Sequence, residues 1–162
     1  MTTKHPRFLA ETDWLAAHLN DADIRVLDCT ASNRPDGSGG IRAESGRGAW
    51  EKEHILGSGH ADLVNDLSDS DAGFRYMLPP VEQFARAFSG YGVGVGTQAV
   101  LYDSTSGSWA TRIWWMLRAF GFDNACVLNG GLHKWKLEGR PVDTAPSAYP
   151  AAIFLAKPRA GL

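Results

Sequence analysis

Apolar residues along this chain gather either in short unbroken runs or at helical spacing. An unbroken apolar run is typical of a strand buried on both faces of a sheet, and spacing of three or four predicts a helix. The predicted elements are strands at residues 24–29, 97–102 and 125–128 and helices at residues 12–19, 81–88, 110–120 and 130–137. Because strands and helices alternate, we expect an α/β fold with a largely parallel sheet. Its site should lie where the strands end, at the carboxyl edge of the sheet.

The stretches between these elements lack a clear period. Residues 32–48 are rich in glycine and predict a loop, followed by a short helix at 49–54 and a brief strand at 61–64. The final stretch is rich in proline and shows little periodicity, which predicts an extended segment. We therefore divide the chain into a domain over residues 1–142 and an extended tail over residues 143–162.

Composition and charge exclude several classes of protein. The 162 residues suffice for one domain with its own core. Lysine and arginine total 16 against 18 acidic residues, so charge gives no argument for nucleic acid or a membrane surface as a partner. No apolar run approaches membrane-spanning length, and the first residues do not resemble a signal peptide. Two cysteines do not make a disulfide scaffold, so we expect a cytoplasmic protein without metal or cofactor.

Three segments carry a resemblance to a known family. They are residues 50–58 (WEKEHILGS), 102–121 (YDSTSGSWATRIWWMLRAFG) and 127–142 (VLNGGLHKWKLEGRPV). In this order and spacing, the chain resembles the rhodanese-type sulfurtransferases over about residues 8–142. The resemblance implies a rhodanese-like α/β fold, with a mostly parallel sheet of about five strands and helices on both faces.

The same segments are most similar to the first half of the two-domain thiosulfate and 3-mercaptopyruvate sulfurtransferases. In those enzymes the second domain carries the reactive cysteine, which accepts a sulfane sulfur from a small anionic donor and passes it to an acceptor. The tail from Tyr149 is similar to their interdomain linker, and the chain ends where their second domain begins. The resemblance therefore implies a second rhodanese domain as partner; a homo-oligomer is the alternative.

The loop that holds the reactive cysteine in this family opens here with Asp103. A carboxylate cannot carry a persulfide, and the loop is one residue longer than the family's active loop when aligned at Ala110. Asp103 can instead accept N–H bonds at the start of the following helix, so we interpret it as structural; repelling anions or handling protons are alternatives. The candidate loop and cleft residues are Asp103, Ser104, Thr105, Ser106, Gly107, Ser108 and Arg112.

Other residues leave two alternative functions open. Cys29 lies at the end of a predicted strand and could serve a single-domain sulfurtransferase, although a buried small residue is the simpler interpretation. Cys126 lies within a strand and should be buried and inert. His54 is expected to pack against its loop, and the spacing of cysteine and histidine supports no metal site. The second alternative is a catalytically silent module that binds a partner or an anion. We predict that this chain alone is inactive as a sulfurtransferase.

Overall fold

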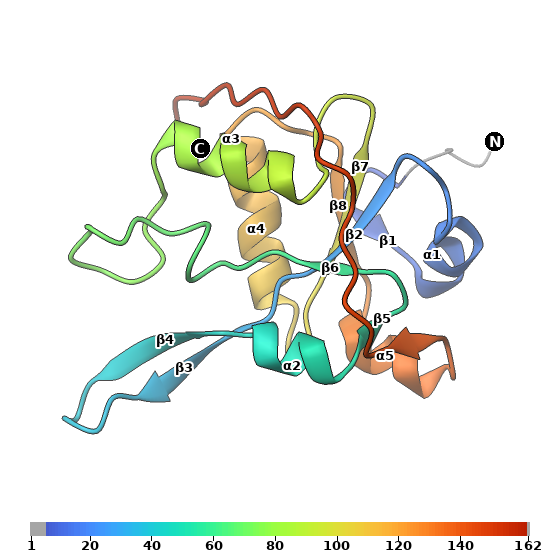
Figure 1. Ribbon diagram of the computed structural model, residues 1–162, viewed down its shortest axis with the longest axis horizontal. Coiled ribbons are helices and arrows are strands. Elements are labelled where there is room, and N and C mark those ends of the chain that lie inside the picture. Colours follow the sequence, from blue (N-terminus) through green and yellow to red (C-terminus); the bar gives the residue numbers. More distant parts are fainter. Residues whose placement is uncertain (1–5, 162) are drawn as a thin grey trace.

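The structure, a computed structural model, describes residues 6–161 (Figure 1). Its centre is a five-stranded sheet in the order β1-β8-β7-β2-β6, with every neighbouring pair parallel. In chain order the strands are β1 (Leu9–Ala10), β2 (Ile24–Asp28), β6 (Gly59–His60), β7 (Gln98–Tyr102) and β8 (Ala125–Leu128). The predicted α/β class and parallel sheet are confirmed, while the two-residue strand β1 was too short to be predicted.

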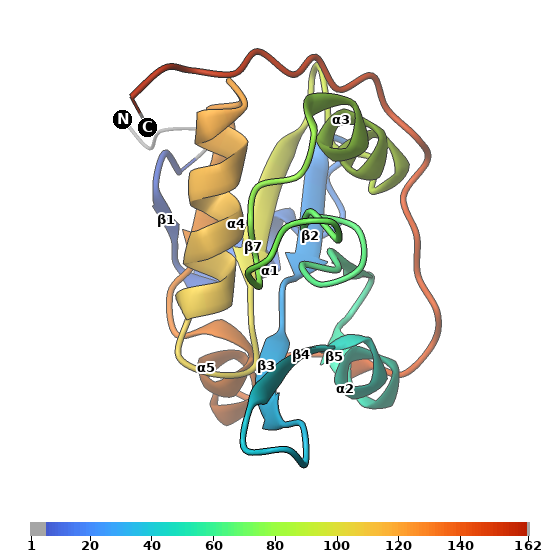
Figure 2. The same cartoon turned by 90° about the vertical axis from the view of Figure 1, so that its left-hand side faces the viewer.

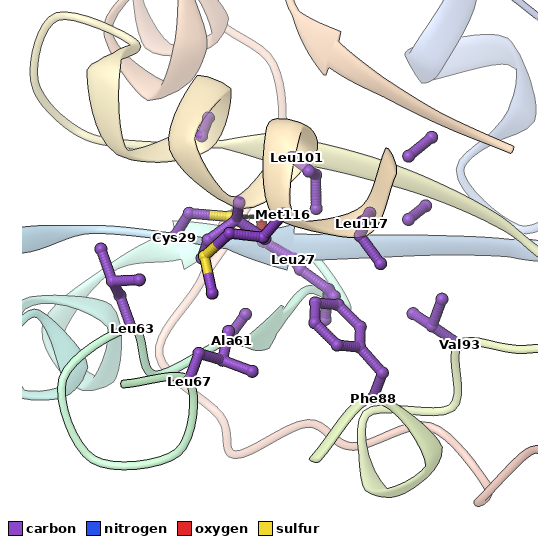
Figure 3. Close-up of a cluster of buried hydrophobic side chains, with 14 of the residues drawn as sticks. Leu27, Cys29, Ala61, Leu63, Leu67, Phe88, Val93, Leu101, Met116 and Leu117 are labelled. Atoms are coloured by element: carbon purple, nitrogen blue, oxygen red, sulfur yellow. Dashed lines mark hydrogen bonds between the residues drawn. The ribbon is translucent and has the colours of Figure 1, made fainter. Parts of the chain in front are cut away.

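Helices cover both faces of the sheet, as Figures 1 and 2 show. They are α1 (Thr12–His18), α2 (Arg47–Lys52), α3 (Val81–Gly90), α4 (Ser108–Ala119) and α5 (Gly131–Leu137). Side chains of successive strand residues point to opposite faces. Accordingly Leu27 and Leu101 join the core beneath α3 and α4 (Figure 3), whereas Val26, Val100 and Tyr102 join the core beneath α1 and α5.

The prediction of a loop at residues 32–48 was wrong. The chain there forms an antiparallel hairpin of β3 (Ala31–Pro35) and β4 (Ile41–Ser45), which projects from the body in Figure 1. Asp36 closes the turn, since its Oδ1 accepts bonds from the amides of Ser38 and Gly40 at 2.8 and 3.0 Å. Most hairpin side chains are exposed, so the strands carry no alternation of apolar residues that would reveal them.

Two neighbouring boundaries were also misplaced. The brief strand expected at residues 61–64 is β6, at Gly59–His60, and the chain then turns around Asp62, whose Oδ1 accepts the amides of Val64 and Asn65. The helix expected at residues 49–54 is α2, which ends at Lys52. His54 instead begins a two-residue strand, β5 (His54–Ile55), paired with β9 (Val142–Asp143).

Residues 144–159 form neither helix nor strand, and this segment packs along the domain. Figure 2 shows it leaving the region of β5 and α2 and crossing beside α3. Phe154 is 5% exposed within the core, and the amide of Lys157 donates to the carbonyl of Phe120 at 2.7 Å. The Tyr149 hydroxyl accepts the Val26 amide at 2.9 Å. The tail thus completes the core; its role as a linker to a second domain stays a prediction. Within residues 6–161 no helix has the length and apolar character needed to cross a membrane.

Candidate functional site

The Asp103 carboxylate fills the loop that follows β7. Its Oδ1 accepts the amides of Thr105 and Gly107 at 2.8 and 3.0 Å and the Thr105 hydroxyl at 2.9 Å. Its Oδ2 accepts the amides of Trp109 and Ala110, in the first turn of α4, at 3.1 and 3.0 Å. Only 1% of Asp103 is exposed. The predicted acceptor role is confirmed, and these bonds together with the helix dipole stabilise the buried negative charge.

This arrangement decides what the loop can bind. A row of backbone amides at a helix start is otherwise a site for an anion or a thiolate. Here four of those amides already donate to the Asp103 carboxylate. The loop therefore offers neither a sulfur nucleophile nor a free amide cradle.

The remaining loop residues lie at the surface above Asp103. The Ser104 amide donates to the Thr30 hydroxyl at 3.0 Å, and that hydroxyl donates to Ser104 Oγ at 3.2 Å. The bonds tie the end of β7 to the segment after β2. Ser106 and Ser108 are exposed and their hydroxyls lie 3.2 Å apart. The structure thus brings the loop candidates together at the carboxyl edge, with Thr30 as a member that the sequence did not reveal.

Arg112 does not belong to this group. Its Nη2 donates to the carbonyl of Tyr76 at 2.7 Å, and its guanidinium carbon lies 4.8 Å from the centroid of the Trp115 ring. Partial burial lowers the pKa of Arg112. The side chain therefore holds the segment around Tyr76 against α4, and it lines neither of the hollows described below.

Both cysteines are buried. Cys29 is 0% exposed and lies among Leu27, Leu101 and Met116 in the core (Figure 3). Burial, together with the charges of neighbouring carboxylates, raises the pKa of the Cys29 thiol well above its usual value. Burial also raises the pKa of Cys126 to about 12. Reactive cysteines need a lowered pKa and access to solvent, so neither thiol has the surroundings of a sulfur carrier.

Two hollows adjoin the loop at the carboxyl edge of the sheet, and Ala49, Lys52 and Ser104 line both of them. The first, of about 640 Å³, lies between α2 and α5 and has His133 and Lys136 on its wall. The second, of about 420 Å³, lies between the base of the β3–β4 hairpin and Ser104. Lys52 could not be predicted as a site residue, because its place between the hollows depends on packing between distant segments.

Two buried histidines, His54 and His60, lie near these hollows without lining them. His54 stacks on Trp50 with ring centroids 4.4 Å apart, and its Nδ1 lies 2.6 Å from the Trp50 carbonyl oxygen. The predicted packing role of His54 is thereby confirmed. His60 lies between Asp28 Oδ1, at 3.7 Å from Nδ1, and Ser45 Oγ, at 3.5 Å from Nε2. Among the described residues, no three His, Cys, Asp or Glu side chains are grouped so that they could hold a metal ion.

Fold and site together define an α/β domain with a parallel five-stranded sheet, in which the loop between β7 and α4 holds a buried carboxylate. The rhodanese-like domain family matches residues 11–138, and the chain belongs to that family. Thiosulfate/3-mercaptopyruvate sulfurtransferase 2 of Arabidopsis thaliana is 35% identical over 147 residues, covering 91% of this chain and 40% of that protein. Thiosulfate sulfurtransferase of Cricetulus griseus is 35% identical over 156 residues, covering 93% of this chain and 50% of that protein.

Solved structures give the same result. The 3-mercaptopyruvate sulfurtransferase SseA from Escherichia coli superposes with a TM-score of 0.79 at 28% identity, over 96% of this chain and 57% of that one. The 3-mercaptopyruvate sulfurtransferase from Leishmania major gives 0.77 at 28% identity, over 98% and 43%. The chain thus spans about half the length of the curated relatives that it matches.

Proposed function

We propose that this chain is the first, non-catalytic domain of a two-domain thiosulfate or 3-mercaptopyruvate sulfurtransferase. In this role it packs against a catalytic rhodanese domain and forms one wall of the substrate cleft, without carrying the persulfide itself. The observation that supports the proposal best is the Asp103 carboxylate, which accepts five hydrogen bonds in the loop where the family places its reactive cysteine.

The chemistry of sulfur transfer supports a non-catalytic role for this domain. A thiolate must attack the sulfane sulfur of the donor, and the resulting persulfide must be held by hydrogen-bond donors until an acceptor arrives. Asp103 has no sulfur, and the loop amides that could hold a persulfide are already bonded. Cys29 and Cys126 are both 0% exposed, which argues against the alternative of a single-domain enzyme that uses Cys29.

The surface around the loop supports the proposed wall. Ser104, Lys52 and His133 line hollows at the carboxyl edge, where the family's chemistry takes place. Hydroxyl and ammonium groups on this wall can donate to an anionic sulfur donor and keep it oriented towards a cysteine on the facing domain. The length of the relatives agrees with a second domain, since this chain covers only 40% and 50% of two of them.

The proposal is tested by measuring thiocyanate formation from thiosulfate and cyanide. We expect the purified chain to give no turnover above the blank, while a curated two-domain thiosulfate sulfurtransferase serves as positive control. We expect Asp103→Cys to gain little, because one sulfur cannot replace two carboxylate oxygens as acceptor for four amides. Circular dichroism must show that this variant is folded. Robust turnover by the unmodified chain would refute the proposal, and full activity of the folded variant would refute the argument about the loop.

A further inference from the structure

Three polar side chains lie in a row next to the hollow between the β3–β4 hairpin and the loop after β7. Asp28 and His60 end the neighbouring strands β2 and β6 and are paired in register, so their side chains point to the same face of the sheet. Asp28 Oδ1 lies 3.7 Å from His60 Nδ1, and Ser45 Oγ lies 3.5 Å from His60 Nε2. Of these three residues, only Ser45, at the end of β4, lines this hollow of about 420 Å³.

The surroundings of His60 determine which of its nitrogens carries the proton. The side chains of His60 and Asp28 are 0% and 2% exposed. An ionised carboxylate only accepts hydrogen bonds, so Asp28 favours a proton on His60 Nδ1, which has no hydrogen-bond partner among residues 6–161. His60 Nε2 then presents its lone pair to Ser45 Oγ. The order of carboxylate, imidazole and hydroxyl is that of a serine activated as a nucleophile.

A second carboxylate holds the Ser45 hydroxyl when no ligand is bound. Ser45 Oγ donates to Asp62 Oδ2 at 2.7 Å. Burial raises the pKa of Asp62, but hydrogen bonds from Ser45 and Asn65 outweigh that effect and hold the pKa below its usual value. A carboxylate with a lowered pKa is a poor proton acceptor, so Asp62 orients the hydroxyl and His60 is the base that can take its proton. The contact between serine and base in such sites is often long until the substrate binds.

We propose that Ser45, His60 and Asp28 form a hydrolytic site for small carboxylic esters, an activity separate from the proposed role in sulfur transfer. Ser45 Oγ bonds to the carbonyl carbon of the ester while its proton passes to His60 Nε2. The bond from that carbon to the alcohol oxygen then breaks, and His60 returns the proton to the alcohol. Water attacks the acyl group on Ser45 in the same way and releases the carboxylic acid. Asp28 stabilises the imidazolium that forms in both steps.

The hollow limits which esters can reach Ser45. Its volume of about 420 Å³ suits a small molecule with a short acyl chain. Lys52 lines the hollow, and its ammonium group can compensate the negative charge that develops on the carbonyl oxygen. Arg34 and Glu44 also line it, and their charged groups lie 3.7 Å apart, so these two charges compensate each other. The site therefore favours a small uncharged ester, such as an acetate ester.

Labelling of the whole chain with phenylmethanesulfonyl fluoride tests this proposal. Attack by Ser45 Oγ forms a bond between sulfur and oxygen and releases fluoride, while His60 takes the proton. Intact mass and peptide mapping then locate the sulfonyl group, which we expect on Ser45 alone. We expect His60→Gln to slow the labelling about a hundredfold. Hydrolysis of nitrophenyl acetate should fall with the labelling in this variant, and Ser45→Ala should reduce it to the level of a blank.

Two further variants serve as matched controls. Ser32 lines the same hollow, and within residues 6–161 its hydroxyl forms no hydrogen bond, so Ser32→Ala should leave labelling and ester hydrolysis unchanged. Asp28→Asn keeps an oxygen for the Thr30 amide but loses the negative charge that favours the proton on His60 Nδ1, so it should slow both reactions. Circular dichroism must show that each variant is folded.

An unlabelled chain would overturn the proposal, and so would a sulfonyl group on another residue instead of Ser45. Undiminished labelling of Ser45 in folded His60→Gln would do the same. If His60→Gln does not fold, an undiminished rate in folded Asp28→Asn has that meaning. Neither reaction uses a sulfane sulfur donor, so their outcome is independent of the thiocyanate assay that tests the proposed function.

Discussion

Replacing Asp103 with alanine is expected to lower the free energy of unfolding by about 3 kcal/mol. The carboxylate is 1% exposed and accepts four amides and one hydroxyl, which lose their acceptor in the variant. Two of these amides begin α4, whose inner side forms part of the core, so the start of that helix should fray. Urea unfolding followed by circular dichroism measures the change.

Asp36→Ala is the matched control for this substitution. Asp36 Oδ1 also accepts two amides and a hydroxyl in a tight turn, but it lies in the solvent-exposed tip of the hairpin. Water can replace those bonds, so we expect a much smaller loss of stability. If Asp103→Ala lowered stability as little as Asp36→Ala, the Asp103 carboxylate would not be the group that organises the loop after β7.

Replacing Phe154 with alanine is expected to cost about 3 kcal/mol of stability. The ring is 5% exposed and lies 5.4 Å from the rings of Phe88 and Phe122, measured between centroids. Removing it leaves a cavity between α3 and the segment after α4. Thermal or urea unfolding of the variant measures the loss.

The neighbouring residue supplies the control. Ile153 is 71% exposed, and only its carbonyl, which accepts the Val95 amide, takes part in the backbone bonds. Ile153→Ala keeps that carbonyl and should change stability little. Equal losses of stability for Ile153→Ala and Phe154→Ala would mean that the tail lies on the surface and adds nothing to the core. The expected contrast would show that it belongs to the fold, whether or not it also leads to a second domain.

The elements that could be predicted from the sequence are those whose buried residues follow one another without a break or recur at helical spacing. Residues 98–102 and 125–128 are almost wholly apolar because helices cover both of their faces. The helical spacing of α4 was equally clear, although the helix begins at Ser108 rather than residue 110. The β3–β4 hairpin gave no such pattern, since its strands are largely exposed and held by a turn and by distant contacts such as Tyr76 Oη to Ser32 O.

In the candidate site, contacts between residues close in the sequence could be predicted, and contacts between distant residues could not. The acceptor role of Asp103 could be predicted because its partners lie within seven residues along the chain. The bond between Thr30 and Ser104 joins residues 74 positions apart, and the bond from Arg112 to Tyr76 joins residues 36 apart. Neither follows from spacing. Only the folded chain shows that Thr30 and Lys52 adjoin the loop and that Arg112 contacts a different segment.

Intact-protein mass spectrometry after incubation with excess thiosulfate tests directly whether this chain carries sulfur. We expect an unchanged mass, because Asp103 cannot hold sulfur and both thiols are buried with raised pKa values. A two-domain relative treated in the same way should gain the mass of one sulfur atom and lose it on addition of cyanide. The same cyanide-sensitive gain on this chain, abolished by Cys29→Ser, would show instead that the chain is a sulfur carrier in its own right.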